Sequence, residues 1–224
     1  MDYNLIRSNR KTIAIHIRNE GAEIRTPLKM PKSAIDEFVR SKEKWIETKL
    51  NEINERHQQH EQFTLNYGSS VLFCGKEYPV EAAENGHAGF DEVRFYMPPD
   101  LNSKQIKAVC IKIYRTLAKR YLIARTHILA EKMDVSPSQI KINNARTRWG
   151  SCSGRKNINY SWRIIMADSE VIDYLITHEL AHLTEMNHSK RFWAVVAEHC
   201  PNYKECEARL KTLQKRLNAE GWNC

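Results

Sequence analysis

The stretch that decides the fold is His178-Glu179-Leu180-Ala181-His182. On a helix, residues four positions apart lie on nearly the same face, so His178 and His182 can bind one metal ion. Glu179 lies one step round the helix, where its carboxylate can reach a water molecule at that ion without being a ligand itself. Zinc lowers the pKa of such a water to about 7, and a neighbouring carboxylate can then accept its proton. The pattern predicts a catalytic zinc site with Glu179 as general base.

The residues around this pattern predict a buried helix. Asp168 is a plausible N-cap, Glu170 is favourably placed in the first turn, and the helix should continue to about Glu185. Apolar residues occur nearly all round it, at 171, 172, 175, 176, 180 and 183. A histidine pair on a helix buried in this way needs a partner, because unpaired polar groups are costly to bury.

His188 is the candidate third ligand, six residues beyond His182. Asn187 tolerates the left-handed conformation that ends a helix, so the chain can double back and present His188 to the same metal. Three protein ligands and one open position are what a catalytic zinc site requires. Phe192 and Trp193 open the next predicted helix and can anchor the returning chain beside the site. Glu198, Glu205 and Cys152 are the alternatives to His188.

Hydrophobic periodicity and turn residues predict an α+β chain. Strands are predicted over 12–18, 22–28, 71–80 with a turn at Gly75-Lys76, 93–97, 140–143 and 157–165. Helices are predicted over 31–60 with a break near Ser41, 103–132, 168–185, 189–199 and 202–217. We therefore expect an N-terminal portion with hairpins over 1–100, followed by a catalytic domain over 101–224 in which the His-Glu-x-x-His helix packs on a small sheet.

Four segments resemble the YgjP-like metallopeptidases, which are related to the SprT-like zinc proteases. They are Thr147-Arg-Trp-Gly-Ser-Cys-Ser153, Asn159-Tyr-Ser-Trp-Arg163, His178-Glu-Leu-Ala-His182 and Asn187-His-Ser-Lys-Arg-Phe-Trp193. The likeness is dense from about residue 141 to 217 and looser before that. It implies a zincin-type fold, zinc held by His178, His182 and His188, and a catalytic Glu179.

Of two related zincin groups, a metzincin assignment is rejected and a gluzincin-type third ligand is a weaker alternative. The spacing to His188 equals that of metzincins, but their turn glycine would fall at Glu185 and no methionine follows Met186 to supply a Met-turn. Gluzincins take their third ligand from a glutamate on a later helix, which keeps Glu198 and Glu205 open.

The loop Arg148-Trp149-Gly150-Ser151-Cys152-Ser153 has three interpretations. It can be a structural turn with Trp149 as a packing anchor. The strand that follows can form a wall of the cleft and pair with an extended substrate. Cys152 can also bind zinc, as an upstream cysteine does in peptide deformylases. An oxyanion stabiliser is expected as well, with Tyr160, His199 and Tyr203 as candidates.

The helix predicted over 103–132 has an apolar and a basic face. The apolar arc contains Ile106, Val109, Ile113, Leu117, Tyr121, Ala124 and Ile128. The basic face contains Lys104, Lys107, Lys112, Arg115 and Lys119. The chain has a net charge of +8, so weak nucleic-acid binding through this stripe is one hypothesis and an ordinary solvated face is the alternative.

Composition limits the class of protein. With 224 residues, 42% hydrophobic and 28% charged, the chain is of ordinary globular type, and it contains no apolar run long enough for a membrane span. The first residues are polar and basic, unlike a signal peptide, and the six cysteines include no C-x-x-C pair. We expect a cytoplasmic protein with free thiols.

The sequence thus supports one leading hypothesis and two alternatives. The leading one is a zinc metallopeptidase that acts on peptides or proteins. The alternatives are a zinc-dependent deformylase or amidase that uses Cys152, and a nucleic-acid-binding module whose zinc site is not catalytic. The oligomeric state does not follow from the sequence.

Overall fold

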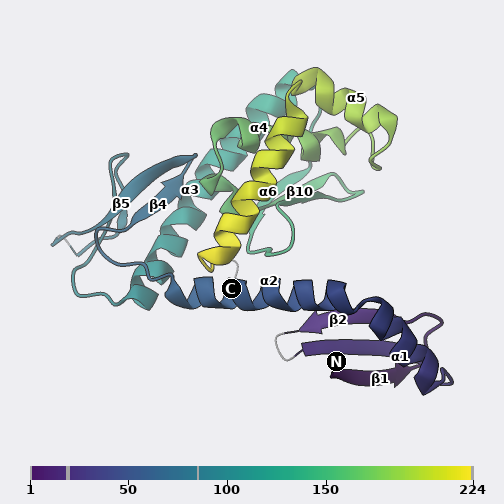
Figure 1. The fold of residues 1–224 in the computed structure, drawn as a ribbon. Coiled ribbons are helices and arrows are strands. Elements are labelled where there is room, and N and C mark those ends of the chain that lie inside the picture. The colour runs from purple at the N-terminus through teal and green to yellow at the C-terminus, as the bar shows by residue number, and fades with distance from the viewer. Residues whose placement is uncertain (1, 19–20, 85, 223–224) are drawn as a thin grey trace. The chain divides into compact units, whose positions relative to one another are not determined.

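The computed structural model describes residues 2–18, 21–84 and 86–222, and the side chains of all of these except 56–62. The chain forms two compact units, Met1–Phe63 and Thr64–Cys224. We call them the N-terminal unit and the C-terminal unit, and Figure 1 shows the helices and strands of each.

The N-terminal unit contains a three-stranded sheet. Its central strand β3 (Gly21–Pro27) pairs in parallel with β1 (Tyr3–Ser8) and antiparallel with β2 (Ala14–Arg18). The hairpin predicted from the isoleucine alternation is therefore confirmed as β2–β3. Strand β1 was not predicted, because most of its side chains are exposed and it carries little apolar alternation.

Two helices complete the core of this unit. Helix α1 (Lys32–Ser41) and helix α2 (Glu43–Gln62) are separated at Lys42, close to the predicted break. Every second residue of β3 is buried, and Ala22 and Ile24 form one apolar cluster with Ile35, Val39 and Ile46 from the two helices. The buried face of β3 and the apolar faces of α1 and α2 thus form one core.

The C-terminal unit begins with a four-stranded sheet of order β4-β5-β7-β6. Its strands are β4 (Ser70–Phe73), β5 (Lys76–Ala82), β6 (Gly89–Phe90) and β7 (Phe95–Met97). Strands β4 and β5 form the predicted hairpin, with its two-residue turn at Cys74-Gly75, one position earlier than expected. Both turn residues have positive φ, 48° and 77°, as the twist of a tight hairpin demands.

Helix α3 (Ser103–Lys132) begins at the predicted place. The Asn102 side chain accepts a hydrogen bond from the Gln105 backbone N–H (3.0 Å), and the Gln105 side chain accepts one from the Asn102 N–H (2.9 Å). This reciprocal capping satisfies two backbone donors that the first turn leaves free.

The buried side of α3 differs from the predicted apolar arc. Ile106 and Ile113 are buried as expected, but Ile128 is 45% exposed. Buried positions instead recur every four residues, at Cys110, Tyr114, Ala118, Leu122, Thr126 and Ala130. Four residues exceed one helical turn, so this line drifts round the helix as the neighbouring elements change along its length. Tyr114 packs on Phe95 and Trp162, whereas Thr126 lies against Tyr160.

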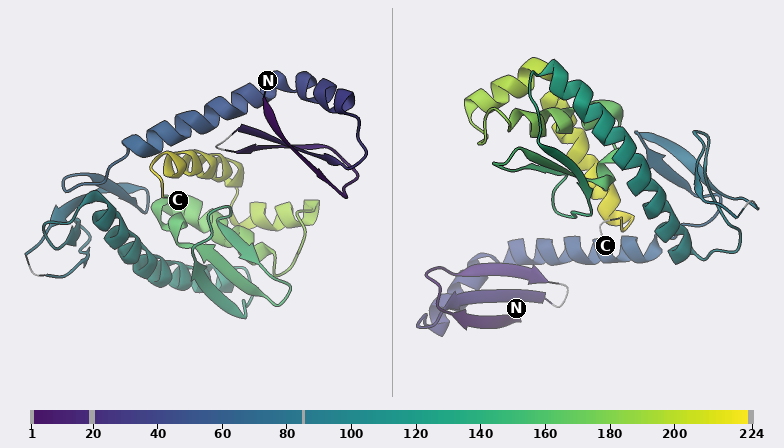
Figure 2. Two further views of the ribbon diagram at one scale, coloured as in Figure 1. Left: turned by 90° about the horizontal axis from the view of Figure 1, so that it is seen from below. Right: turned by 180° about the vertical axis from the view of Figure 1, so that it is seen from behind.

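A second sheet, of order β8-β10-β9, lies next to α3. Its strands are β8 (Gln139–Asn143), β9 (Gly150–Cys152) and β10 (Asn157–Ser161). Strand β10 is central, parallel to β8 and antiparallel to β9. Both views of Figure 2 show these green strands beside the teal α3.

The strand predicted over 157–165 ends at Ser161. Residues Trp162–Met166 form a 3-10 helix, η1, in which all five side chains are buried. A short apolar run that is buried on all sides has no alternation to distinguish a strand from a helix. Within η1, Trp162 stacks on Tyr114, with ring centroids 5.7 Å apart.

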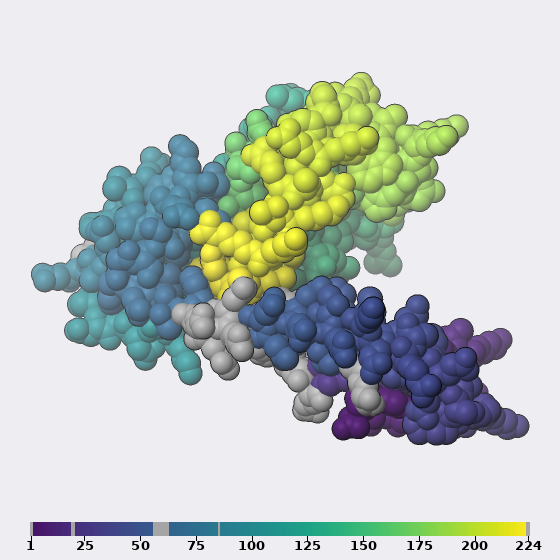
Figure 3. All heavy atoms as spheres, viewed as in Figure 1, coloured from purple at the N-terminus to yellow at the C-terminus, as the bar shows by residue number. Residues whose placement is uncertain are grey.

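Three helices follow: α4 (Ser169–Ala181), α5 (Lys190–His199) and α6 (Tyr203–Ala219). Helix α4 contacts α3, α5, α6 and β9, which explains why it is apolar nearly all round. Its burial is confirmed, but it ends four residues before the predicted Glu185. In Figure 3, α5 and α6 form part of the surface of the C-terminal unit.

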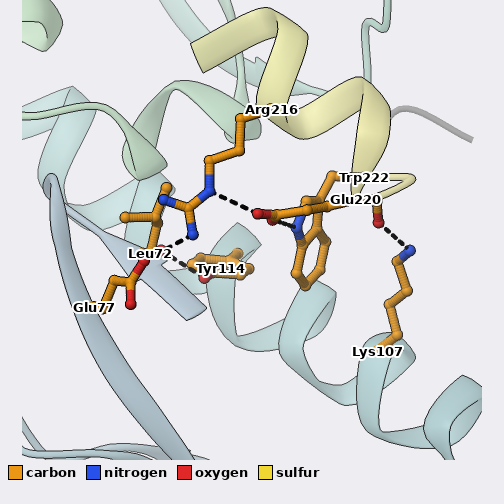
Figure 4. A network of polar contacts seen from close by, with 7 residues as sticks. All are labelled: Leu72, Glu77, Lys107, Tyr114, Arg216, Glu220 and Trp222. Carbon is orange, nitrogen blue, oxygen red and sulfur yellow. Dashed lines mark hydrogen bonds and ion pairs between the residues drawn. The ribbon is translucent and has the colours of Figure 1, made fainter. Parts of the chain in front are cut away.

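A polar network holds the end of α6 in place (Figure 4). Glu220 accepts hydrogen bonds from Arg216 (2.6 Å) and from the indole of the buried Trp222 (2.8 Å). Arg216 also bonds Glu77 of β5 (2.8 Å), and Lys107 of α3 donates to the Glu220 carbonyl (2.8 Å). The network therefore joins α6 to α3 and to the first sheet of the unit.

The division of the sequence into an N-terminal portion over 1–100 and a metallopeptidase domain over 101–224 remains a prediction. Along the chain, the first compact unit ends at Phe63 and the second begins at Thr64. Among the described residues, no helix is long and apolar enough to cross a lipid bilayer.

Candidate active site

Helix α4 carries His178 and Glu179 of the motif. It starts at the predicted cap, where Asp168 accepts a hydrogen bond from the Val171 N–H (3.1 Å). Its last residue is Ala181, and His182 is the C-cap. The rings of His178 and His182 are 5.2 Å apart between centroids, as expected for residues four apart on one helix face.

Tight turns after Ala181 bring the chain back. The N–H groups of Leu183 and Thr184 bond carbonyls three residues earlier, at 2.9 and 3.1 Å. Ser189 then caps α5 by accepting a hydrogen bond from the Phe192 N–H (3.3 Å), so His188 lies one residue before that cap. Asn187 does not have a positive φ. The expectation of a left-handed Asn187 is therefore wrong, and the early end of α4 makes the return instead.

The side chains of His178, His182 and His188 converge. Their candidate ligand atoms all lie within 4.8 Å of one another. The Nε2 atoms of His178 and His188 are 3.1 Å apart. Two nitrogens on a tetrahedral zinc at about 2.0–2.1 Å would be roughly 3.3 Å apart, so this spacing fits a zinc ion with little movement.

The surroundings of the three histidines also fit a metal. Nδ1 of His182 lies 3.1 Å from the Glu185 carbonyl oxygen. A proton on Nδ1 donates to that oxygen and leaves the Nε2 lone pair free, which is how metal-binding histidines are commonly oriented. Burial lowers the pKa of His178 to about 4 and, through the same cause, lowers that of His182. Both rings are therefore neutral at neutral pH, the form that binds metal.

Phe192 forms the apolar floor under these rings. It is fully buried, and its ring centroid lies 4.9, 4.5 and 4.7 Å from those of His178, His182 and His188. Beside it, Trp193 stacks on His188 at 5.9 Å and on Tyr203 at 5.1 Å. The expectation that this pair anchors the returning chain is confirmed. The close packing restricts the orientation of all three imidazoles.

Glu179 lies against strand β9. This residue is 4% exposed, and a Cβ placed on Gly150 would be 2.3 Å from its Oε1 atom. Only glycine allows the β9 backbone to come so close to the carboxylate. Burial raises the pKa of Glu179 to about 8, and the positive charge of Arg148 acts in the opposite direction.

Strand β9 has an open edge next to Glu179. In the described part of the chain it pairs with β10 alone. The Trp149 carbonyl accepts from the Ser161 N–H (2.7 Å) and the Ser153 N–H donates to Asn157 (3.0 Å), so the odd-numbered residues face β10. By the alternation of an antiparallel ladder, the backbone groups of Gly150 and Cys152 point to the open side. Strand β10 is paired on both sides, so the interpretation of 157–165 as a strand that binds substrate is wrong, and the open edge belongs to β9.

The structure separates the candidates that the sequence left open. The group within 4.8 Å contains, of the described residues, neither Cys152 nor Glu198 nor Glu205. Tyr160 is fully buried, and its hydroxyl lies 3.4 Å from that of Thr126, so it has no access to a substrate. Burial and the charge of Glu179 raise the pKa of Cys152, which disfavours its thiolate form.

Three features of the site were not found from the sequence: the contact between Gly150 and Glu179, the Glu185 carbonyl, and the open edge of β9. A glycine inside a strand was the available signal for the first, since such a residue often marks a close backbone approach. The carbonyl is a backbone group that every residue carries, so no residue type reveals its role.

The fold and this arrangement define a class. An α+β chain with a buried His-Glu-x-x-His helix beside a small sheet, and a third histidine returned to it, is a zincin-like metallopeptidase. Residues 11–213 match the family described as YgjP-like, metallopeptidase domain, and the chain belongs to this family. It is therefore a hydrolase, and peptides or proteins are its class of substrate.

Two solved structures are similar to part of this chain, each with low sequence identity. Abylysin of Pyrococcus abyssi, solved as a metallopeptidase zymogen, is 23% identical over 41% of this chain and 92% of its own, with a TM-score of 0.38. Jannalysin of Methanocaldococcus jannaschii, also a metallopeptidase zymogen, is 21% identical over 42% of this chain and 95% of its own, with a TM-score of 0.34. A comparison with curated proteins finds no match.

Proposed function

We propose that the chain is a zinc-dependent peptidase in which His178, His182 and His188 hold the metal ion and Glu179 is the general base. The observation that carries the proposal is the convergence of three imidazoles beside a buried carboxylate from the same helix. Three nitrogen ligands and one open position suit a catalytic zinc ion.

Bound zinc would supply a Lewis acid that polarises the substrate carbonyl and lowers the pKa of water and of Glu179. The Glu179 carboxylate accepts a proton from the water whose oxygen attacks the carbonyl carbon. It then gives that proton to the amine nitrogen as the C–N bond breaks. Burial keeps competing water away from Glu179, and the missing side chain of Gly150 leaves room for its Oε1 atom.

The open edge of β9 is proposed to bind the substrate in an extended conformation. The free backbone groups of Gly150 and Cys152 can form ladder hydrogen bonds with a peptide, a mode in which backbone bonds contribute the affinity. Because Gly150 contacts Glu179, a peptide paired at this edge runs past the carboxylate.

The two alternative functions have less support. A deformylase or amidase that uses Cys152 would need this thiol among the ligands, yet it lies outside the three-histidine group. A nucleic-acid-binding module with a non-catalytic metal would not require the buried Glu179 beside the histidines.

Metal analysis tests the ligand assignment. We expect freshly purified protein to contain about one zinc ion per chain, and His178→Ala and His182→Ala to lose it, since each removes one ligand. His188→Ala should weaken binding strongly. Protein that contains no zinc and takes up none on titration would refute the site. Retention of zinc by His188→Ala together with its loss in Cys152→Ser would favour the deformylase-like alternative.

The Glu179→Gln variant tests the general base. It should keep zinc and fold but cleave unfolded protein about a hundred to ten thousand times more slowly, because it removes the base and preserves the shape. Glu198→Gln is the matched control, since it makes the same change on an exposed residue of α5 and should retain both zinc and cleavage. Cleavage by Glu179→Gln at the parent's rate would refute the mechanism.

A further inference from the structure

The segment that forms the second sheet is basic throughout. No Asp or Glu occurs between Asp134 and Asp168. Its cations are Lys141, Arg146, Arg148, Arg155, Lys156 and Arg163. Arg163 is buried and donates to backbone carbonyls and to Asn144, so it serves the fold. Lys141 lies on β8, which forms the opposite edge of the sheet from β9.

The other four cations flank β9. Arg146 and Arg148 precede the strand, and Arg155 and Lys156 lie in the turn that follows it. All four are exposed, and none forms an ion pair or a side-chain hydrogen bond with the described residues. Arg148 lies near enough to Glu179 for its charge to act on that carboxylate. We call these four residues the β9 cations.

We propose that the β9 cations select peptide substrates with acidic side chains on either side of the bond that is cleaved. The inference rests on the proposed function, because it takes β9 as the edge that binds substrate. Strand residues advance about 3.3 Å each and alternate sides. A peptide paired with the three residues of β9 therefore extends beyond both ends of the strand, where the long side chains of the β9 cations can reach its carboxylates.

The strand edge favours a peptide over a nucleic acid as the occupant. Gly150 and Cys152 present both N–H and C=O groups, and a peptide backbone offers an acceptor and a donor at matching intervals. A phosphate backbone has acceptors and no donors for the two carbonyls. Cations beside a peptide-binding edge thus favour substrates whose side chains are negatively charged.

The test uses one peptide sequence with Glu, Gln or Lys at the positions flanking the cleaved bond. The parent protein should cleave the Glu peptide with the highest kcat/KM and the Lys peptide with the lowest, by about two- to fivefold for each acidic residue that meets a cation. The preference should weaken as salt rises. Replacing the β9 cations with Gln should remove it, whereas Lys141→Gln, with one cation lost from the opposite edge, should not.

Binding to Glu179→Gln protein, followed by fluorescence anisotropy of labelled peptides, tests the same preference without the need for cleavage. The Glu peptide should bind more tightly than the Gln peptide, and the difference should vanish without the β9 cations. Equal cleavage and equal binding of the three peptides would overturn the inference and leave the proposed function intact. Selective binding without any cleavage by the parent would refute the proposed function and, with it, the selection of substrates by the β9 cations. Binding of a single-stranded oligonucleotide that depends on the β9 cations, with no preference among the peptides, would overturn the inference in favour of nucleic acid.

Discussion

At position 150, a glycine allows the backbone of β9 to lie against the carboxylate of Glu179, the proposed general base. We predict that Gly150→Ala retains zinc but lowers kcat about a hundredfold or more, because the added methyl group must displace Glu179. The overlap should also lower the free energy of unfolding by about 1–3 kcal/mol. Peptide cleavage and urea unfolding measure the two effects.

Two further substitutions test whether the effect of Gly150→Ala arises from its contact with Glu179. Glu179→Asp shortens the side chain, so the stability cost of Gly150→Ala should be smaller in the Glu179→Asp background. Gly154→Ala is the control: a Cβ at this position meets no atom within 4 Å. Strictly additive stability effects of Gly150→Ala and Glu179→Asp would show that the contact does not constrain the carboxylate.

Single residues also mark the limit of what the sequence reveals about the site. His178, Glu179 and His188 could be selected because each has a side chain suited to metal or proton chemistry. Gly150 has no such chemistry, and its importance arises from a contact with a residue far along the chain. The same holds for Phe192, which the sequence placed beside the site but could not place under all three imidazoles.

Among the elements, α3 carries the basic stripe proposed for nucleic acid. Lys112, Arg115 and Lys119 belong to this stripe, and all three are exposed. Lys107 is instead tied to the Glu220 carbonyl and lies over the Trp222 ring. If the stripe binds DNA, replacing Lys112, Arg115 and Lys119 with Gln should weaken binding. The slope of the logarithm of the binding constant against the logarithm of salt concentration should flatten by about 0.9 for each lost phosphate contact. Fluorescence anisotropy against salt concentration measures both.

Helix α1 and the start of α2 provide the matched control for that experiment. Arg40→Gln, Lys42→Gln and Lys44→Gln remove the same number of cations from another part of the chain. If both triple variants lose affinity equally, only net charge matters. DNA binding that is absent at low salt would show that the stripe is an ordinary solvated face.

Helices were predicted better than strands for a physical reason. The starts of α3 and α4 could be predicted from their N-cap residues, Asn102 and Asp168. Such a capping signal is local, because the cap bonds a backbone group only a few residues away. Strand β9 has three residues, one of them glycine, and exists because β10 pairs with it. Such pairing depends on residues elsewhere in the chain, so it could not be predicted from β9 itself. A loop was expected around Trp149-Gly150, where the structure has the strand that contacts Glu179.

At the scale of the C-terminal unit, Trp222 joins the end of the chain to the core. It is 2% exposed and packs edge-on against Tyr114, with ring centroids 5.7 Å apart. We predict that Trp222→Ala lowers the free energy of unfolding by about 3–5 kcal/mol, as expected for truncation of a large buried aromatic residue. Urea unfolding measures this, and Val93→Ala, at a residue that is 70% exposed, should change it by less than about 0.5 kcal/mol. An equally small effect of Trp222→Ala would show that the packing contributes little.

The open edge of β9 also affects how copies of the protein behave toward one another. Unpaired strand edges are sites where two molecules can join their sheets and aggregate, and short edges flanked by charge resist this. Strand β9 is three residues long, and Arg146, Arg148, Arg155 and Lys156 lie on both sides of it. Joining two such edges would bring these like charges together. The cations that we propose to attract acidic peptides would therefore also keep the edge free of other copies of the chain and favour solubility.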